Sequence, residues 1–119
     1  MDRQKTKPAV VLVVDDDEAA RLMMVATLEQ AGFSVLTAAN CGAARAIFQQ
    51  QELNIILLDV LLPDGDGFTL CAEFLSHPRG RDLPIAMVTG LDDVESISLA
   101  YQSGATDFIT KPVSWGTLP

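Results

Sequence analysis

The stretch VLVVDDDE, residues 11–18, decides the fold because four apolar residues lead directly into four acidic ones. Neighbouring carboxylates repel one another and resist leaving water. A run of aliphatic residues followed at once by such a cluster is typical of a buried strand that ends at a polar edge. The question is therefore why a buried strand ends in several neighbouring carboxylates, and the rest of the sequence bears on the answer.

Five apolar runs of strand length recur along the 119 residues, at 9–14, 34–38, 54–58, 84–89 and 106–110. Each run is mostly aliphatic on both faces. That pattern is typical of strands in a parallel sheet that is buried between helices.

Between these runs, four segments carry apolar residues at helical spacing: 18–31, 41–50, 68–75 and 94–102. Gly32 and Gly104 favour the ends of the first and last of them. Strand and helix alternate throughout, which predicts an α/β fold with a five-stranded, parallel, doubly wound sheet. We expect the inner faces of the helices to be formed by Leu22, Met23, Val25, Ala26, Ala44, Ile47, Phe48, Leu70, Cys71, Phe74, Leu75, Ile97, Leu99, Ala100 and Tyr101.

The composition argues against several classes of partner. The net charge of −8, from 16 acidic and 8 basic residues, opposes direct binding to nucleic acid or to an anionic membrane, and suits a metal cation or a basic partner surface. No run approaches the roughly 18 apolar residues of a membrane span. Cys41 and Cys71 lack metal-ligand spacing, so we read them as small hydrophobic residues in a reducing cytoplasm.

Four predicted strands end in residues that carry chemistry. Asp15 and Asp16 follow the first strand, Asp59 the third, Thr89 ends the fourth, and Lys111 follows the fifth. Because the carboxyl ends of parallel strands meet at one edge of a sheet, we expect these groups to converge. Carboxylates there favour Mg²⁺, while a lysine and a hydroxyl can hold anionic oxygens, which together favour phosphoryl transfer.

The alternative interpretation is a set of solvated loop aspartates that cap the following helix. Asp17 and Glu18 fit that interpretation, because acidic residues are favoured in the first turn of a helix. Asp15 and Asp16 alone would fit it too. Their expected convergence with Asp59, Thr89 and Lys111 favours a site instead.

Four motifs contain these residues: Val-Val-Asp-Asp at 13–16, Leu-Leu-Asp-Val-Leu-Leu-Pro-Asp-Gly-Asp-Gly at 57–67, Val-Thr-Gly at 88–90 and Gly-Ala-Thr-Asp-Phe-Ile-Thr-Lys-Pro at 104–112. Together they resemble the receiver domain of bacterial two-component response regulators of the chemotaxis-regulator type. They occur in the order and spacing of that family and span nearly the whole chain. The resemblance implies a flavodoxin-like strand order, 2-1-3-4-5.

The resemblance implies a metal site and an acceptor. Asp59 would take a phosphoryl group from a phosphohistidine on a partner kinase or phosphotransfer protein. Asp16 and Asp59 would bind Mg²⁺ through their side chains, and Leu61 through its backbone carbonyl. Asp15 would act partly through water.

The resemblance also implies a switch. Lys111 would pair with a phosphoryl oxygen, and the hydroxyl of Thr89 would move inward to bond another. Phe108 matches the aromatic residue that follows this movement. Pro112 matches the residue after the lysine, which is often preceded by a cis peptide bond.

The ends of the chain raise further expectations. We read 1–8 as a disordered lead and 9–119 as a receiver domain lacking most of its last helix, since Ser114 could cap a helix whose first turn is cut short. The sheet surface beside the fifth strand should then be apolar and exposed. Trp115 and its surroundings resemble receivers that precede a cyclic-di-GMP synthase, although a DNA-binding output domain or a hybrid kinase stays open. The face formed by the fourth helix and fifth strand could mediate a dimer.

The prediction is therefore a Mg²⁺-dependent phosphoacceptor switch and not an enzyme that turns over an external substrate. One rival is a flavodoxin-like carrier, but Asp15, Asp16 and Asp17 would repel a phosphate there. A second rival is a degenerate receiver that acts only as a docking module. An absence of any Mg²⁺ effect would favour that rival.

Overall fold

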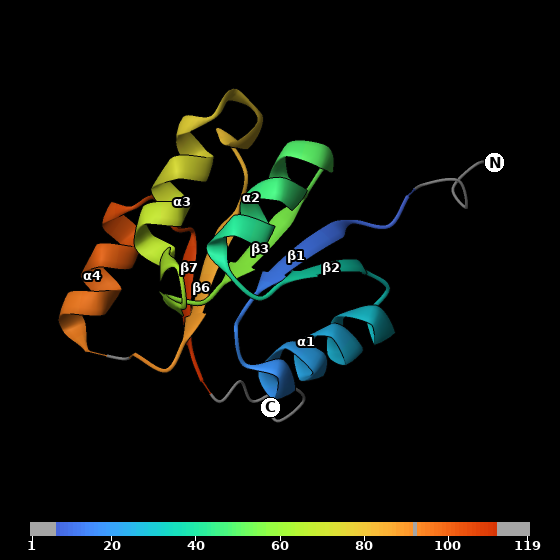
Figure 1. Cartoon of the computed structure of the whole chain (residues 1–119), viewed down its shortest axis with the longest axis horizontal. Coiled ribbons are helices and arrows are strands. Elements are labelled where there is room, and N and C mark those ends of the chain that lie inside the picture. The colour runs from blue at the N-terminus through green and yellow to red at the C-terminus, as the bar shows by residue number, and fades with distance from the viewer. Residues whose placement is uncertain (1–6, 92, 112–119) are drawn as a thin grey trace.

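The computed structural model describes residues 7–91 and 93–111, which form a parallel sheet flanked by helices (Figure 1). The sheet has the strand order β2-β1-β3-β6-β7, and all neighbouring strands in it are parallel. This confirms the predicted α/β class and strand order. Its strands are β1 (Val10–Val14), β2 (Ser34–Ala38), β3 (Ile55–Leu58), β6 (Ile85–Thr89) and β7 (Asp107–Thr110).

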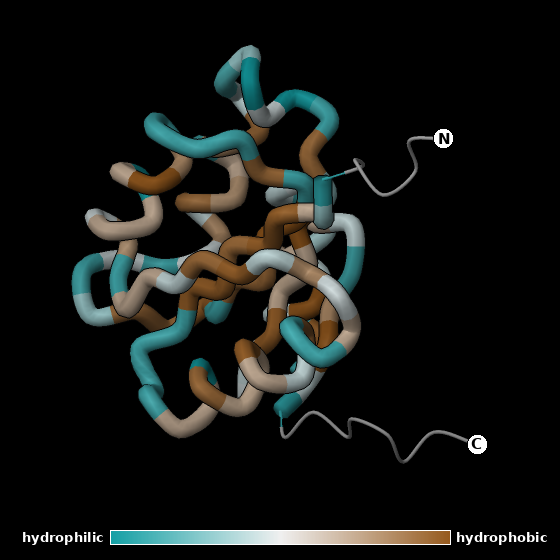
Figure 2. Tube along the Cα trace, turned by 90° about the vertical axis from the view of Figure 1, so that its right-hand side faces the viewer, coloured by the Kyte–Doolittle hydropathy of each residue, from teal (hydrophilic) through white to brown (hydrophobic). Residues whose placement is uncertain are grey.

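The helices of the described residues lie in two layers, one on each face of the sheet. They are α1 (Glu18–Gln30), α2 (Cys41–Gln50), α3 (Gly67–Ser76) and α4 (Val94–Gln102). Residues of α2, α3 and α4 belong to one hydrophobic cluster, and Met24 and Leu28 of α1 belong to the other. Figure 2 shows the hydrophobic strands at the centre of the molecule, with hydrophilic segments around them.

The two core clusters follow from the alternation of side chains along each strand. In β1, Leu12 and Val14 join the cluster under α2, α3 and α4, while Val11 and Val13 join the cluster under α1. All four side chains are buried because β1 lies inside the sheet with a helix layer on each face. This burial on both faces fixes the direction in which the strand end points.

Each helix in the described part of the chain begins at a side chain that accepts a backbone N–H. The N-cap residues are Asp17, Asn40, Asp66 and Asp93 for α1, α2, α3 and α4. Such caps satisfy donors that the first turn of a helix leaves free. Gly32, which follows α1 with a positive φ of 98°, accepts a backbone conformation that other residues rarely adopt. Asp17 thus has the helix-starting role that the sequence predicts.

Two short elements were not predicted. Strands β4 (Leu61–Leu62) and β5 (Gly65–Asp66) form an antiparallel hairpin directly after Asp59. A single turn of 3-10 helix, Pro78–Gly80, follows α3. The sequence indicated a sharp turn at Pro63 but not the pairing of the two flanking dipeptides.

The predicted inner faces of α1 and α4 are partly wrong. In α1, Leu22 and Met23 are exposed, whereas Met24 is buried. In α4, Leu99 and Tyr101 are exposed, and Ser96 and Ala100 form the buried side. The predicted inner faces of α2 and α3 agree with the buried residues Ala44, Phe48, Leu70, Cys71 and Phe74.

Several expectations concern residues outside the described ranges. They are residues 1–6 of the lead expected at 1–8, the peptide bond before Pro112, and a fifth helix beginning near Ser114. The sheet surface beside the fifth strand of the sheet was expected to be apolar and exposed. In this strand, β7, the apolar side chain of Ile109 is half-buried and belongs to the cluster under α1. Within the described residues, no helix is both long and apolar enough to cross a bilayer.

Candidate functional site

Four neighbouring strands carry the predicted site residues at one edge of the sheet. Asp15 follows β1, Asp59 follows β3, Thr89 ends β6 and Lys111 follows β7. These strands are adjacent in the order β1-β3-β6-β7, so their carboxyl ends lie side by side. The predicted convergence of these residues is confirmed.

Asp59 is held firmly at the end of β3. Its side chain is buried, and its backbone N–H donates to the carbonyl oxygen of Val14 at 2.9 Å. Carboxylate oxygen Oδ1 accepts the N–H of Val60 at 2.7 Å, and Oδ2 accepts the ammonium of Lys111 at 2.9 Å. A carboxylate bound on both oxygens has little freedom to rotate, so Asp59 presents a defined face to the edge.

Asp15 is the more deeply buried of the two acids, with an exposed fraction of 0%. Its Oδ1 accepts the N–H of Asp17 at 2.9 Å, and its Oδ2 lies 2.7 Å from the ammonium of Lys111. Burial raises the pKa of the Asp15 carboxyl above its usual range, and the hydrogen bond from Lys111 opposes that shift. The cost of burying this charge is thus offset mainly by the lysine.

Lys111 bridges the two acids from the end of β7, the edge strand of the sheet. Burial lowers the pKa of its ammonium, but the hydrogen bonds to Asp15 and Asp59 outweigh burial and leave the pKa raised. The lysine is therefore charged at neutral pH. Its backbone N–H also donates to the carbonyl oxygen of Thr89 at 2.8 Å, which sets β7 in register with β6.

A carboxylate cluster at this edge fits a hard cation. Oxygen atoms of Asp15, Asp16 and Asp59 all lie within 4.8 Å of one another, with Asp16 exposed and the other two buried. Oxygen ligands from carboxylates are the donors that hard divalent cations prefer. Leu61 lies in the first strand of the hairpin, where its side chain is 61% exposed. The donor set therefore suits a cation held between β1 and β3.

The predicted switch residues lie in the last two strands of the sheet order, Thr89 at the end of β6 and Phe108 in β7. Thr89 is buried, and its hydroxyl oxygen accepts the N–H of Leu91 over a long 3.4 Å. Phe108 is half-buried and packs against the cluster under α2, α3 and α4. The hydroxyl of Thr89 is therefore held only by one long hydrogen bond, and the ring of Phe108 is not fully enclosed.

Two residues near the site were missed by sequence reasoning. The guanidinium of Arg21 on α1 donates to the backbone carbonyl of Asp15 at 2.7 Å. The carboxylate of Asp64, in the hairpin turn, accepts two N–H groups from the start of α2. The positions of both depend on which elements pack together, and no local motif signals either contact.

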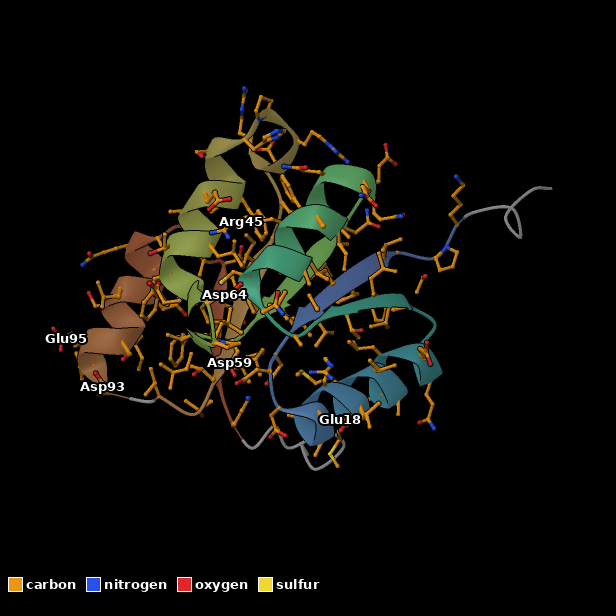
Figure 3. All side chains as sticks on the ribbon, in the orientation of Figure 1. Glu18, Arg45, Asp59, Asp64, Asp93 and Glu95 are labelled. Carbon is orange, nitrogen blue, oxygen red and sulfur yellow. The ribbon has the colours of Figure 1, made fainter. Side chains whose placement is uncertain are left out.

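Acidic residues lie on both sides of Asp59 in the view of Figure 3. Figure 3 shows Glu18 of α1 on one side of Asp59, and Asp93 and Glu95 near the start of α4 on the other. The largest hollow among those described, about 330 Å³, lies at the opposite edge of the sheet. It is lined by Phe48, Gln51, Glu52, Leu53, Asn54, Arg79 and Leu83, and contains none of the strand-end residues.

Comparisons with known proteins agree with this geometry. Residues 11–119 match the response regulator receiver domain family. The response regulator PleD of Caulobacter vibrioides is 39% identical over 105 residues, which cover 88% of this chain and 23% of PleD. Curated relatives of this similarity are longer than this chain, which spans between 23% and 44% of them.

Solved structures show the same architecture. The chemotaxis response regulator CheY4 of Vibrio cholerae is similar with a TM-score of 0.85 and 33% identity, over 90% of this chain and 89% of that one. A response regulator from Burkholderia pseudomallei, solved with a phosphorylated aspartic acid and a calcium ion, has a TM-score of 0.83 and 25% identity, over 89% and 61% of the two chains. The chain therefore belongs to the receiver domain family of two-component response regulators, whose general role is to accept a phosphoryl group in signalling.

Proposed function

We propose that Asp59 is the residue of this receiver domain that accepts the phosphoryl group. The observation that carries this assignment is the Lys111 ammonium, which lies 2.9 Å from Asp59 and 2.7 Å from Asp15. Asp59 has a carboxylate oxygen at the strand edge, beside a cation that can hold a phosphoryl oxygen. A solved relative from Burkholderia pseudomallei carries a phosphorylated aspartic acid, which supports the same chemistry here.

In the proposed transfer, a carboxylate oxygen of Asp59 forms a P–O bond as the P–N bond of a phosphohistidine breaks. The electron pair of the broken bond returns to the imidazole nitrogen of the donor. A magnesium ion bound by Asp16, Asp59 and the Leu61 carbonyl, and by Asp15 partly through water, would neutralise charge on the phosphoryl oxygens. Water later attacks the acyl phosphate and releases inorganic phosphate.

Lys111 and Thr89 would then hold the transferred group. The ammonium of Lys111 would leave Asp15 and pair with a phosphoryl oxygen, and the hydroxyl of Thr89 would exchange its long bond with Leu91 for another phosphoryl oxygen. Phe108 would follow Thr89 inward. These movements would bias the domain between two populations that differ on the face formed by α4 and β7.

Intact-mass spectrometry tests the assignment most directly. The wild type and Asp59→Asn are incubated with a small-molecule phosphodonor, with Mg²⁺ and with a chelator. We expect one added phosphoryl group on the wild type only, and only with Mg²⁺. A folded wild type that gains no mass under any condition would support the docking-module rival instead.

Membership of the receiver domain family indicates the general classes of partner. Receiver domains interact with histidine kinases or phosphotransfer proteins and with output domains. We propose an output domain in a longer chain, with a cyclic-di-GMP synthase as the form favoured by the residues around Trp115. Assaying a full-length product for cyclic-di-GMP synthesis, and separately for DNA binding, distinguishes the two main forms of output.

A dimer through α4 and β7 is the second proposed partner interaction. Val94 and Tyr101 of α4 are seven residues apart, so they lie on one face of the helix, and both are large apolar side chains that are exposed, Val94 by 83%. Exposed apolar side chains that neighbour one another can mark an interaction surface. Sedimentation of the chain with and without phosphodonor tests this: phosphorylation should raise the dimer fraction, and Tyr101→Glu should lower it.

A further inference from the structure

The hairpin after Asp59 is joined to a helix far from it in sequence. Asp64, in the turn between β4 and β5, accepts the N–H of Cys41 at 2.7 Å through Oδ1 and the N–H of Gly42 at 2.9 Å through Oδ2. These are the first two residues of α2. Figure 3 shows Asp64 near Asp59 and toward the start of α2.

The N-terminus of α2 already has a capping residue, Asn40, and Asp64 provides a second set of acceptors. Asn40 accepts the N–H of Ala43 at 2.7 Å through its side chain and the N–H of Ala44 at 3.1 Å through its carbonyl. The two N–H groups that Asn40 leaves free are those taken by Asp64. These two hydrogen bonds lower the pKa of the Asp64 carboxyl, so it stays charged next to the positive end of the α2 dipole.

The same contact packs the hairpin closely against α2. A Cβ atom added at Gly65 would lie 3.1 Å from the buried sulfur of Cys41, closer than most neighbours of a real Cβ. On the other side of the hairpin, Asp66 accepts the N–H of Thr69 at 2.8 Å and caps α3. The hairpin is thus fixed to the first turns of two helices.

A fixed hairpin matters because of the ligand that it carries. Asp16 is exposed and can adjust its carboxylate by rotating the side chain, but a backbone carbonyl has no such freedom. The carbonyl of Leu61 moves only with its strand, β4, and β4 is paired with β5 around the Asp64 turn. The position of the turn therefore sets the position of this ligand.

We infer that Asp64 is a positioning residue for the cation site, acting by clamping the β4–β5 hairpin to the start of α2. The inference rests on the proposed function, in which the Leu61 carbonyl is a magnesium ligand. Groups that orient metal ligands without touching the metal contribute strongly to affinity. Asp64 acts through the backbone, so its removal should weaken magnesium binding without removing any ligand.

Isothermal titration calorimetry with MgCl₂ on the 119-residue chain tests the inference, together with thermal unfolding of each variant without magnesium. We expect Asp64→Ala to raise the magnesium dissociation constant on the order of tenfold. Asp64→Asn keeps one acceptor oxygen, so it should give a smaller increase. If Asp64→Ala does not fold, Asp64→Asn still provides the test.

The matched control is Asn40→Ala, which removes a cap from the same helix but does not touch the hairpin. It should lower the unfolding temperature and leave the magnesium dissociation constant within about twofold of the wild type. Equal dissociation constants for Asp64→Asn, Asn40→Ala and the wild type would overturn the clamp and leave the proposed function intact. A wild type that binds no magnesium would overturn both.

Discussion

The amino ends and the carboxyl ends of the parallel strands form two edges of the sheet, and polar side chains have different roles at each. At the amino edge, Asn54 accepts the N–H of Val10 at 2.7 Å, and Arg79 donates to the carbonyls of Gln49 and Gln51 at 2.8 and 2.9 Å. At the carboxyl edge, two buried acids share one lysine. The first arrangement completes backbone hydrogen bonds, whereas the second crowds like charges.

This difference separates stability from function within one sheet. Polar side chains at the amino edge satisfy backbone groups that would otherwise lack partners, so they stabilise the fold. The carboxyl edge carries more negative than positive charge inside the protein, which opposes folding and favours an incoming cation. Substitutions at the two edges should therefore respond differently to Mg²⁺.

The largest expected effect is at Lys111. Lys111→Met leaves Asp15 and Asp59 without their cation, and should lower the free energy of unfolding by about 3 kcal/mol. This lies at the low end for a broken buried pair because the lysine side chain is 23% exposed. Urea unfolding with a chelator and then with MgCl₂ measures it. Magnesium should recover part of the loss, and an identical loss in both conditions would contradict the charge argument.

Two glycines allow a matched comparison of the edges. A Cβ added at Gly67 would overlap the carbonyl oxygen of Asp59, and one added at Gly80 would overlap the carbonyl oxygen of Phe74. Gly67→Ala and Gly80→Ala should each lower the free energy of unfolding by about 1–3 kcal/mol.

Only Gly67→Ala should also weaken magnesium binding and phosphoryl acceptance, because it displaces the backbone at Asp59. Calorimetric titration and intact mass measure these effects. If Gly80→Ala impaired both to the same degree, the two edges would not be independent.

Arg79→Met gives a smaller effect at the amino edge. It removes the hydrogen bonds to Gln49 and Gln51 but keeps an apolar stem near the ring of Phe48. We expect a loss of about 1 kcal/mol in the free energy of unfolding, since the bonds are exposed. Unlike the loss in Lys111→Met, this loss should be the same with and without MgCl₂.

The last effect is a pH dependence at the start of α2, which is absent at neutral pH. Burial, followed by the hydrogen bond with Asp64, raises the pKa of the Cys41 thiol from 9.0 to about 11. Because the folded pKa is the higher one, the stabilising contribution is complete below pH 9 and is lost as the pH rises toward 11. The stability difference between the wild type and Cys41→Ala should therefore decline across that interval. A difference independent of pH would contradict the raised pKa.

The order of elements and the convergence of the site could be predicted because they depend on local patterns. Apolar runs ending in Asp15, Asp59 and Thr89 predict strands, and a parallel sheet brings their ends together. The predicted helices 41–50 and 94–102 agree with α2 and α4 to the residue.

The rotation of α1 could not be predicted for a physical reason. Residues 22–26 are all apolar, so periodicity alone does not select an inner face. Packing of the helix on the sheet selects Met24 and Leu28, with Arg21 on the same side reaching the carbonyl of Asp15. The hydrogen bond between Asp64 and Cys41 could not be predicted either, because the two residues are 23 positions apart and only the packing of the hairpin on α2 brings them together.

The ion pair between Asp59 and Lys111 joins residues that are 52 positions apart. A chain growing from its N-terminus on the ribosome therefore presents both buried acids well before the cation that balances them. Until β7 is added, the two acids have no cation to balance their charge inside the protein, so their burial is unfavourable. The proposed acceptor residue thus acquires its ion pair only when β7 joins the sheet.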